Sequence, residues 1–215
     1  MMIKPKTFGI LFLLFVLLTL FFDVLPRVFP IPSAPSALGG GEVIFLQTHL
    51  SSEVMDYWWV LVYTAGYIFL IYGTATFLLW KGDVVGFKRY FWVFFLSQCF
   101  ALSTWLLHPV APPRLAVEGV RDIRGEIFGA SEKFNAFVYG AFPSMHAANG
   151  LTALLFVRRI GRRWLEVWTV LWLTVLFSTL YLGEHYWQDL AGGGLYSLLS
   201  YSLVTKIFAR RYRVM

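Results

Sequence analysis

Apolar residues in this chain come in long runs, which short polar or basic stretches separate. A helix needs about 20 apolar residues to cross a bilayer, and we count six candidate runs. They lie at roughly 8–25, 57–80, 90–108, 143–158, 164–183 and 190–208. The fourth run is the shortest, because Arg158 and Arg159 end it, so we expect it to begin below the membrane surface. The pattern predicts an all-α fold, an integral membrane bundle of six transmembrane helices.

The runs predict one membrane domain over residues 1–215, without a second domain. We expect a first transmembrane helix within 1–25, an external loop at 26–56 and a helical core at 57–208. The external loop carries Pro, Ser and Gly without helical periodicity. Its stretch VIFLQTHL is typical of a short segment that lies on the membrane surface.

The first run has a second interpretation, a cleaved signal peptide. Lys4 and Lys6 precede the run, and small residues follow it near Ser36 and Ala37. A run of about 18 residues is long for the core of a signal peptide, so a transmembrane helix is the interpretation we favour.

Composition and charge agree with a membrane protein. The 215 residues are 58% hydrophobic and 14% charged, more apolar than one soluble core could bury. Of the 18 Lys and Arg residues, 13 fall on one side of the six-span arrangement with only 2 acidic residues, and the other side holds 5 basic and 10 acidic residues. The 13 are Lys4, Lys6, Lys81, Lys88, Arg89, Arg158, Arg159, Arg162, Arg163, Lys206, Arg210, Arg211 and Arg213.

This asymmetry predicts an orientation, because Lys and Arg are retained on the cytoplasmic side. Both termini are therefore expected in the cytoplasm. The net charge of +6 then reflects anchors at a lipid surface, and we expect no nucleic-acid partner. The single cysteine, Cys99, supplies neither a disulfide framework nor a thiolate metal cluster.

Three polar clusters fall together on the opposite, external side. AFPSMHAAN enters the fourth run, GEHYWQD joins the fifth to the sixth, and HPVAPPR follows the third. In the first cluster, Pro143 and Ser144 are typical of a helix start with Ser at the cap. The amides of such a start bind anions, and His146 lies within its first turn.

The other two clusters supply a second histidine and an arginine. His185 and Asp189 are spaced i, i+4, so on a helix they would share a face, and the carboxylate would accept the second imidazole N–H. Arg114, after the rigid Ala-Pro-Pro, offers a fork of donors to phosphate oxygens. An anion site with two histidines and an orienting carboxylate suits phosphoryl transfer without a required metal.

These residues resemble the type 2 phosphatidic acid phosphatase superfamily of lipid phosphatases, lipid phosphotransferases and vanadium haloperoxidases. Its Pro-Ser-x-His motif matches Pro143-Ser144-Met145-His146. Another of its motifs consists of Ser-Arg, five further residues, His, three further residues and Asp. This motif matches the stretch from Ser178 to Asp189, except that Thr179 replaces the arginine. Its first motif is a lysine followed downstream by Arg-Pro, and in this sequence only Arg114 matches it. Ala-Pro-Pro, FPSMHA and YLGEHYWQDL look more like the branch that contains inositol phosphorylceramide synthases.

The resemblance implies an integral membrane enzyme that cleaves a phosphoester of a lipid phosphate, with its active site on the extracytoplasmic side. It implies that His185 attacks phosphorus, forming a phosphohistidine, and that His146 protonates the departing oxygen and then activates the acceptor. Asp189 would orient His185, and Arg114 and Ser144 would bind the phosphate. Its partners are the lipid phosphate substrate and membrane lipids, and no cofactor or metal is expected. The acceptor, water in a phosphatase or an alcohol in a phosphotransferase, stays open.

Several residues have simpler interpretations. His49 and His108 are typical of interfacial anchors, and Glu184 is expected to point away from the site. Arg121, Arg124 and Lys133 are candidates to replace the missing Lys and Arg of the motifs, and no spacing selects among them.

The run Gly192-Gly193-Gly194 predicts close helix packing. The H-E-x-x-H spacing of zinc proteases is absent from the sequence.

Two other functions stay as alternatives. A transporter or a lipid-binding scaffold would use the polar cluster only to bind an anion. A haloperoxidase would need bound vanadate and a soluble, helix-rich surround, which six spans disfavour.

Overall fold

The computed structural model describes residues 3–29, 37–129 and 137–213, and within them the chain is helical without a β-strand. An isolated bridge pairs Val110 with Gly140. The elements in chain order are α1 (Pro5–Val24), η1 (Leu25–Val28), α2 (Gly41–Leu50), α3 (Glu53–Leu61), η2 (Val62–Gly66), η3 (Phe69–Gly73), α4 (Thr74–Trp80), α5 (Val84–Leu107), α6 (Pro113–Ala116), α7 (Ile123–Phe128), α8 (Met145–Val157), α9 (Arg162–Tyr181) and α10 (Trp187–Arg213). The expected all-α fold is confirmed.

Four helical stretches of the described chain are long and apolar enough to cross a membrane. They are Pro5–Val28, Glu53–Trp80, Val84–Leu107 and Arg162–Tyr181, and they match the first, second, third and fifth predicted spans. The fourth predicted span corresponds to α8, which has only 13 residues. The sixth corresponds to α10, which is long, with 27 residues, but is not among the four. The count of six spans therefore stays a prediction.

The predicted external loop is partly helical. Its stretch VIFLQTHL lies in α2, which packs against α9. Ser36, beside the alternative cleavage point, lies outside the described residues. Whether the first helix is retained or cleaved therefore stays open, although α1 and η1 continue without a break from Pro5 to Val28.

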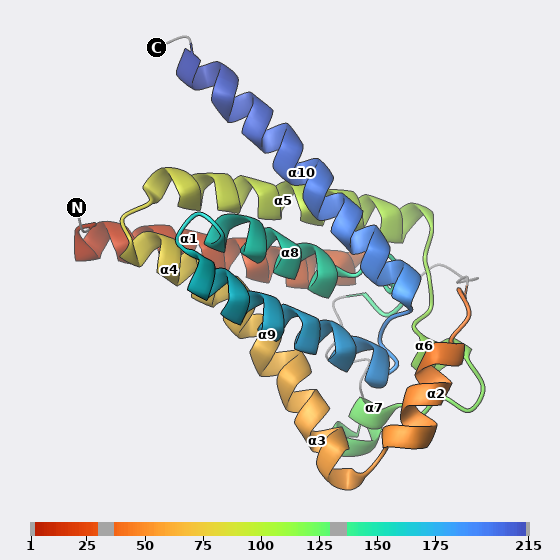
Figure 1. The fold of residues 1–215 in the computed structure, drawn as a ribbon. Helices are drawn as coiled ribbons and strands as arrows, with labels where there is room; N and C mark the ends of the chain where they lie inside the picture. The colour runs from red at the N-terminus through yellow and green to blue at the C-terminus, as the bar shows by residue number, and fades with distance from the viewer. Residues whose placement is uncertain (1–2, 30–36, 130–136, 214–215) are drawn as a thin grey trace.

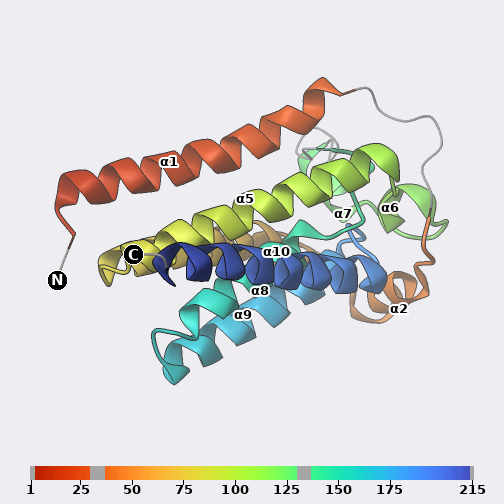
Figure 2. The same ribbon diagram turned by 90° about the horizontal axis from the view of Figure 1, so that it is seen from above.

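The long helices lie side by side, with α8 among them (Figure 1). Helix α8 packs against α5, α9 and α10, and α1 runs along the rim of the bundle against α4 and α5 (Figure 2). The α4–α5 and α8–α9 turns lie at the same end as the N-terminus, and α2, α6 and α7 gather at the opposite end. This arrangement brings the predicted external segments together at one end of the molecule.

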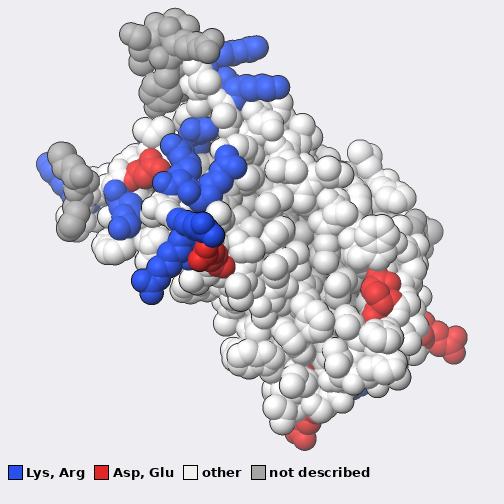
Figure 3. All heavy atoms as spheres, in the orientation of Figure 1, with Lys and Arg blue, Asp and Glu red and all other residues white. Residues whose placement is uncertain are grey.

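Charge is distributed unevenly between these two ends. The basic side chains in Figure 3 gather toward the end that holds the N-terminus and the α4–α5 and α8–α9 turns. Acidic side chains appear mostly toward the other end, apart from two that lie among the basic ones. The segregation agrees with the sequence count, and the placement of both termini in the cytoplasm stays a prediction.

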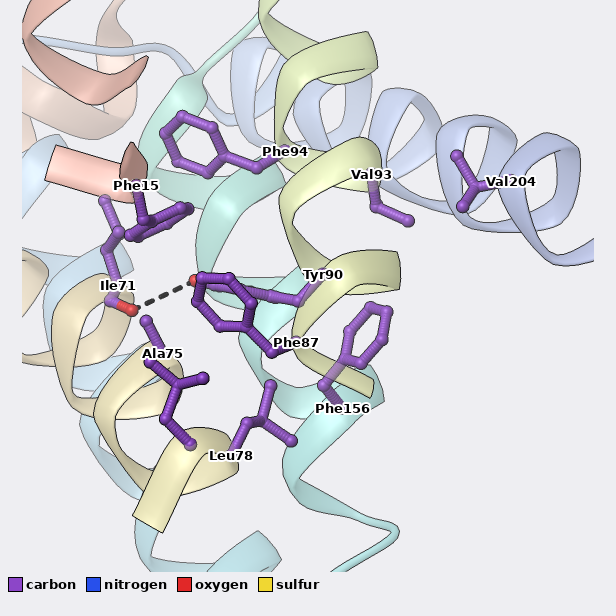
Figure 4. Close-up of a cluster of buried hydrophobic side chains, with 11 residues drawn as sticks. Phe15, Ile71, Ala75, Leu78, Phe87, Tyr90, Val93, Phe94, Phe156 and Val204 are labelled. Atoms are coloured by element: carbon purple, nitrogen blue, oxygen red, sulfur yellow. Dashed lines mark hydrogen bonds between the residues drawn. The ribbon is translucent and has the colours of Figure 1, made fainter. Parts of the chain in front are cut away.

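A cluster of buried apolar side chains joins α1, η3, α4, α5, α8 and α10 (Figure 4). Phe15 of α1 packs there with Ile71, Tyr90 and Phe94. The Tyr90 hydroxyl donates a hydrogen bond of 3.1 Å to the backbone oxygen of Ile71, drawn as the dashed line in Figure 4. The cluster fixes α1 to the bundle, although Phe15 and Phe22 are the only residues of α1 that are buried.

The glycines at the start of α10 allow the closest helix contact near the site. A Cβ atom added at Gly193 would overlap the backbone oxygen of Ser144, and one at Gly192 would overlap the ring of Phe142. At Gly194 the nearest atom would be Leu151 Cδ2, at an ordinary 3.9 Å. The predicted close packing is confirmed for Gly192 and Gly193.

We expect Gly193→Ala to destabilise the protein by about 3 kcal/mol or more, because backbone rather than a flexible side chain would have to move. Thermal unfolding in detergent measures the effect. Gly194→Ala is the matched control, since its methyl group finds room and alanine favours a helix over glycine. Equal melting temperatures for the two variants would contradict the role given to Gly193.

Candidate active site

Three backbone hydrogen bonds bring the three predicted polar clusters together. The Val110 N–H donates to Tyr139 O at 2.9 Å and the Ala141 N–H donates to Val110 O at 3.1 Å, which joins HPVAPPR to AFPSMHAAN. The Arg114 N–H donates to Gly183 O at 3.0 Å, which joins HPVAPPR to GEHYWQD. The expectation that the clusters meet is confirmed.

Ser144 starts helix α8, as the sequence predicts. Its Oγ accepts a hydrogen bond of 3.3 Å from the Ala147 N–H, and its own N–H donates to Asp189 O at 3.0 Å. The preceding Phe142–Pro143 peptide bond is cis. Since the hydroxyl is fully buried and engaged in this cap, a contact between Ser144 and phosphate stays a prediction.

His185 does not share a helix with Asp189, which corrects the expected i, i+4 geometry. Helix α10 begins at Trp187, so His185 lies in the turn before it. Its Nδ1 is 2.9 Å from Ala141 O and 3.4 Å from Asp189 Oδ2. The same Oδ2 accepts from the Tyr186 N–H at 2.7 Å, so Asp189 caps the start of α10. The carboxylate thus fixes the turn that carries the imidazole, and the shorter imidazole bond goes to a backbone oxygen.

This bond determines the tautomer of His185. A carbonyl oxygen only accepts hydrogen bonds, so the Nδ1 atom must carry the proton and Nε2 keeps its lone pair in the neutral ring. Nε2 of His185 lies 3.4 Å from Nδ1 of His146. In that contact the proton belongs to His146. In the neutral pair the two histidines therefore differ, because His185 presents an Nε2 lone pair and His146 presents an Nδ1–H.

Two tyrosines that the sequence analysis missed enclose the His146 ring. The ring centroids of Tyr63 and Tyr67 lie 4.4 Å and 4.1 Å from that of His146. The Tyr67 hydroxyl accepts from Asn149 Nδ2 at 2.7 Å. Both tyrosines belong to the helix from Glu53 to Trp80 near its two π-helical segments, η2 and η3, a feature often found at functional sites. Their spacing of four residues is the only signal in the sequence that they share a face.

A cavity of about 620 Å³ extends from the histidines into the bundle. His146, His185, Glu184 and Arg124 line its polar part. Apolar walls come from α1, η3 and α5 and include Leu20, Phe22, Ile71 and Phe94. Ile71 and Phe94 also belong to the buried cluster of Figure 4, so this cluster forms part of the cavity wall. The shape suits a molecule with one anionic end and one apolar end.

Glu184 takes part in the site, contrary to the expectation that it points away. It lies in the turn rather than on a helix, and its side chain is 5% exposed. Glu184 Oε1 accepts from Arg114 Nε at 3.0 Å and from an Arg124 terminal nitrogen at 2.7 Å. One carboxylate therefore holds both guanidinium groups.

Arg114 and Arg124 differ in their access to the cavity. The Arg114 side chain is fully buried, pairs also with Asp122 at 3.5 Å, and does not line the cavity. Arg124 lines it and lies 4.7 Å over the Tyr63 ring. Burial lowers the pKa of Arg124, but the interactions with Tyr63 and Glu184 outweigh this effect and raise it above its ordinary value. Arg124 therefore remains a cation, and a direct phosphate contact by Arg114 stays a prediction.

The other basic candidates are placed elsewhere or not described. Arg121 is 41% exposed and pairs with Asp56 and Glu126, and it is absent from the cavity lining. Lys133 lies outside the described residues. His49 and His108 also do not line the cavity. Of the two described candidates for the missing motif residues, Arg121 and Arg124, Arg124 is therefore the one that this structure brings to the histidines.

Comparisons with known proteins agree with the resemblance carried by the motifs. A family model described as the PAP2 superfamily matches residues 31–203. The inositol phosphorylceramide synthase of Candida albicans is 27% identical over 61% of this chain and 30% of its own length. The lipid A 4'-phosphatase of Bacteroides thetaiotaomicron is 41% identical over 32% of this chain and 33% of its own.

A third relative is the inositol phosphorylceramide synthase catalytic subunit aur1 of Schizosaccharomyces pombe, 33% identical over 41% of this chain and 21% of its own. The alignments thus span a third or less of these curated relatives. No solved structure matches the chain.

Proposed function

Because the chain belongs to the PAP2 superfamily, we propose that it is an enzyme that cleaves the phosphoester of a lipid phosphate through a phosphohistidine. Its long apolar helices make it a multi-pass membrane protein. The observation that carries the proposal is the pair of histidines at the cavity, with His185 Nε2 3.4 Å from His146 Nδ1 and His185 Nδ1 2.9 Å from Ala141 O.

In the first half of the reaction, His185 Nε2 forms a bond to phosphorus and the bond from phosphorus to the lipid oxygen breaks. His146 acts as the imidazolium, which the bound phosphate anion stabilises; it gives its Nδ1 proton to that oxygen and becomes neutral, so the lipid leaves as an alcohol. In an in-line displacement the leaving oxygen lies opposite the nucleophile. Substrate binding must therefore replace the direct contact between the two rings with the phosphoryl group.

In the second half, an acceptor oxygen attacks the phosphohistidine. His146, now neutral with a free Nδ1, takes the proton of the acceptor, and His185 is released with its original lone pair. Ala141 O and Asp189 keep the imidazole oriented in both halves, since Asp189 Oδ2 anchors the turn and Ala141 O binds Nδ1–H.

Negative charge on the phosphoryl oxygens requires fixed positive partners. We assign this role first to Arg124, held by Glu184 and Tyr63 at the cavity wall. Arg114 contributes indirectly, because it pairs with Glu184 and neutralises its charge. Ser144 fixes the start of α8, whose amides favour an anion. By the charge asymmetry, the site faces away from the cytoplasm.

The identity of the acceptor distinguishes two candidate functions. Water as acceptor makes the protein a phosphatase, as the name of the Bacteroides thetaiotaomicron relative indicates for that protein. An alcohol makes it a head-group phosphotransferase, and two of the three relatives are synthases of that kind by name. Both use the same two histidines.

Purified protein in detergent with EDTA tests the proposal on a panel of lipid phosphates, lipid pyrophosphates and phosphoinositides, with and without alcohol acceptors. Free phosphate would identify a phosphatase, and a new phospholipid formed only with an acceptor would identify a transferase. Turnover in EDTA also tests the expected independence from metal ions. If no lipid is turned over but the protein still binds phosphate, the result would favour the non-enzymatic scaffold instead.

We expect Arg124→Gln to lower kcat/KM by roughly 10²–10³-fold, the usual cost of removing one donor to the transition-state charge. Arg124→Lys should recover part of the loss, because it keeps the charge without the fork. The matched control is Arg121→Gln, which removes a neighbouring arginine outside the cavity. Equal activities of the two glutamine variants would remove Arg124 from the site.

A further inference from the structure

Gln98 lines the catalytic cavity from the middle of α5 and is not used by the mechanism above. Its side chain is about nine-tenths buried, at 9% relative exposure. It makes no hydrogen bond with any residue that the structure describes. By contrast, the cavity hydroxyls of Thr19 and Tyr72 are hydrogen-bonded to each other.

The Gln98 amide is open to the cavity and is not enclosed by protein, so whatever fills the cavity must supply its hydrogen-bond partner. Helix α5 is one of the four stretches apolar enough to cross a membrane. Polar residues in such helices commonly mark a binding site or pathway, and an apolar ligand that covered the amide would leave it unsatisfied at a cost. Gln98 carries both a donor and an acceptor, so it can pair with a carbonyl or a hydroxyl group.

The position along α5 indicates which part of a substrate Gln98 would meet. Phe94, Gln98 and Trp105 are spaced by four and seven residues, so they share one face of the helix, and all three line the cavity. Trp105 packs beside Gly140, next to the Ala141 oxygen that binds His185. Seven residues of helix place Gln98 roughly 10 Å farther into the bundle.

A lipid phosphate held at the histidines would therefore present to Gln98 the region where its chains are attached. In lipids with acyl chains, this region carries amide or ester carbonyls and chain hydroxyls. In polyprenyl phosphates it is hydrocarbon.

We propose that Gln98 is a specificity-determining residue that hydrogen-bonds the acyl linkage of the substrate, and that the substrate is an acylated lipid phosphate rather than a polyprenyl phosphate. This inference rests on the proposed function. A hydrocarbon chain in the same place would leave the amide without a partner, and sites built to hydrogen-bond a substrate group discriminate strongly against analogues that lack it.

The test compares an N-acyl sphingoid phosphate, a diacylglycerol phosphate and a polyprenyl phosphate on wild type and Gln98→Met, which keeps the length of the side chain without its polar atoms. We expect wild type to favour at least one acylated lipid over the polyprenyl lipid by tenfold or more in kcat/KM, because the loss of one hydrogen bond typically costs about an order of magnitude. Gln98→Met should lower that ratio about tenfold without lowering polyprenyl turnover.

Ser103→Ala on the exposed side of α5 is the control, and its ratio should equal that of wild type. The same lipids are also compared by thermal stabilisation of His185→Ala protein with and without Gln98→Met, a readout that needs no turnover. Absent turnover of all lipids counts against the proposed function alone. A wild-type preference for the polyprenyl lipid, or an equal effect of Gln98→Met on all three lipids in both assays, would overturn the inference.

Discussion

Replacing His185 by alanine is expected to lower turnover roughly 10⁴-fold or more, because the nucleophile is lost together with the covalent intermediate. Arg124, Glu184 and the capped start of α8 do not depend on the imidazole, so binding of inorganic phosphate should persist. Release of phosphate or of new lipid measures the first effect. A rapid alkaline quench with labelled substrate should trap an acid-labile, alkali-stable phosphoenzyme in wild type and none in the variant.

The matched control for this experiment is His49→Ala. His49 is an exposed histidine of α2, bonded only to Phe45 O within its own helix, and it does not line the cavity. Its variant should retain full activity. A labelled phosphoenzyme that survives in His185→Ala would assign the nucleophile to another residue.

Replacing His146 by glutamine should lower turnover of a lipid phosphate by about 10²–10⁴-fold, the usual contribution of a general acid. The loss should depend on the leaving group. An alkyl oxygen needs the proton that His146 Nδ1 carries, whereas an aryl oxygen of low pKa can leave without it. We therefore expect a much smaller loss for an aryl phosphate, measured as kcat/KM on both esters.

Tyr67→Phe is a useful companion to this variant, because it keeps the ring against His146 and removes only the hydroxyl that Asn149 binds. It should affect both esters alike and only slightly. Equal losses for alkyl and aryl esters in His146→Gln would mean that His146 positions the substrate and does not donate a proton.

The sequence was sufficient for the parts of the site that depend on local pattern. Ser144 was predicted as a helix cap because a hydroxyl residue stood before an apolar run, and the structure has that cap. The meeting of the three polar clusters followed from their common side in the alternation of apolar runs. The long helices were predicted in the same way, from the length of each run.

The remaining site features depend on tertiary geometry that no spacing encodes. The i, i+4 pattern of His185 and Asp189 suggested one helix, but α10 begins at Trp187, where Asp189 caps its first turn, and His185 lies in the preceding turn. That turn directs Glu184 toward two arginines, where helical geometry would have directed it away. Between the described candidates Arg121 and Arg124, only the folded structure selects Arg124, because its side chain lines the cavity and that of Arg121 does not.

The shortness of α8 has a consequence for the membrane around the protein. Its 13 residues span roughly 20 Å, about 10 Å less than the hydrocarbon core of a typical bilayer. In the predicted orientation Arg158 and Arg159 lie at the inner boundary, and the proposed phosphate site would then sit inside the outer leaflet. A lipid head group must then leave its usual plane to react, and a thicker bilayer would increase that displacement. Reaction rate would thus be coupled to hydrophobic thickness, with lipid composition acting as a regulator that needs no binding site of its own.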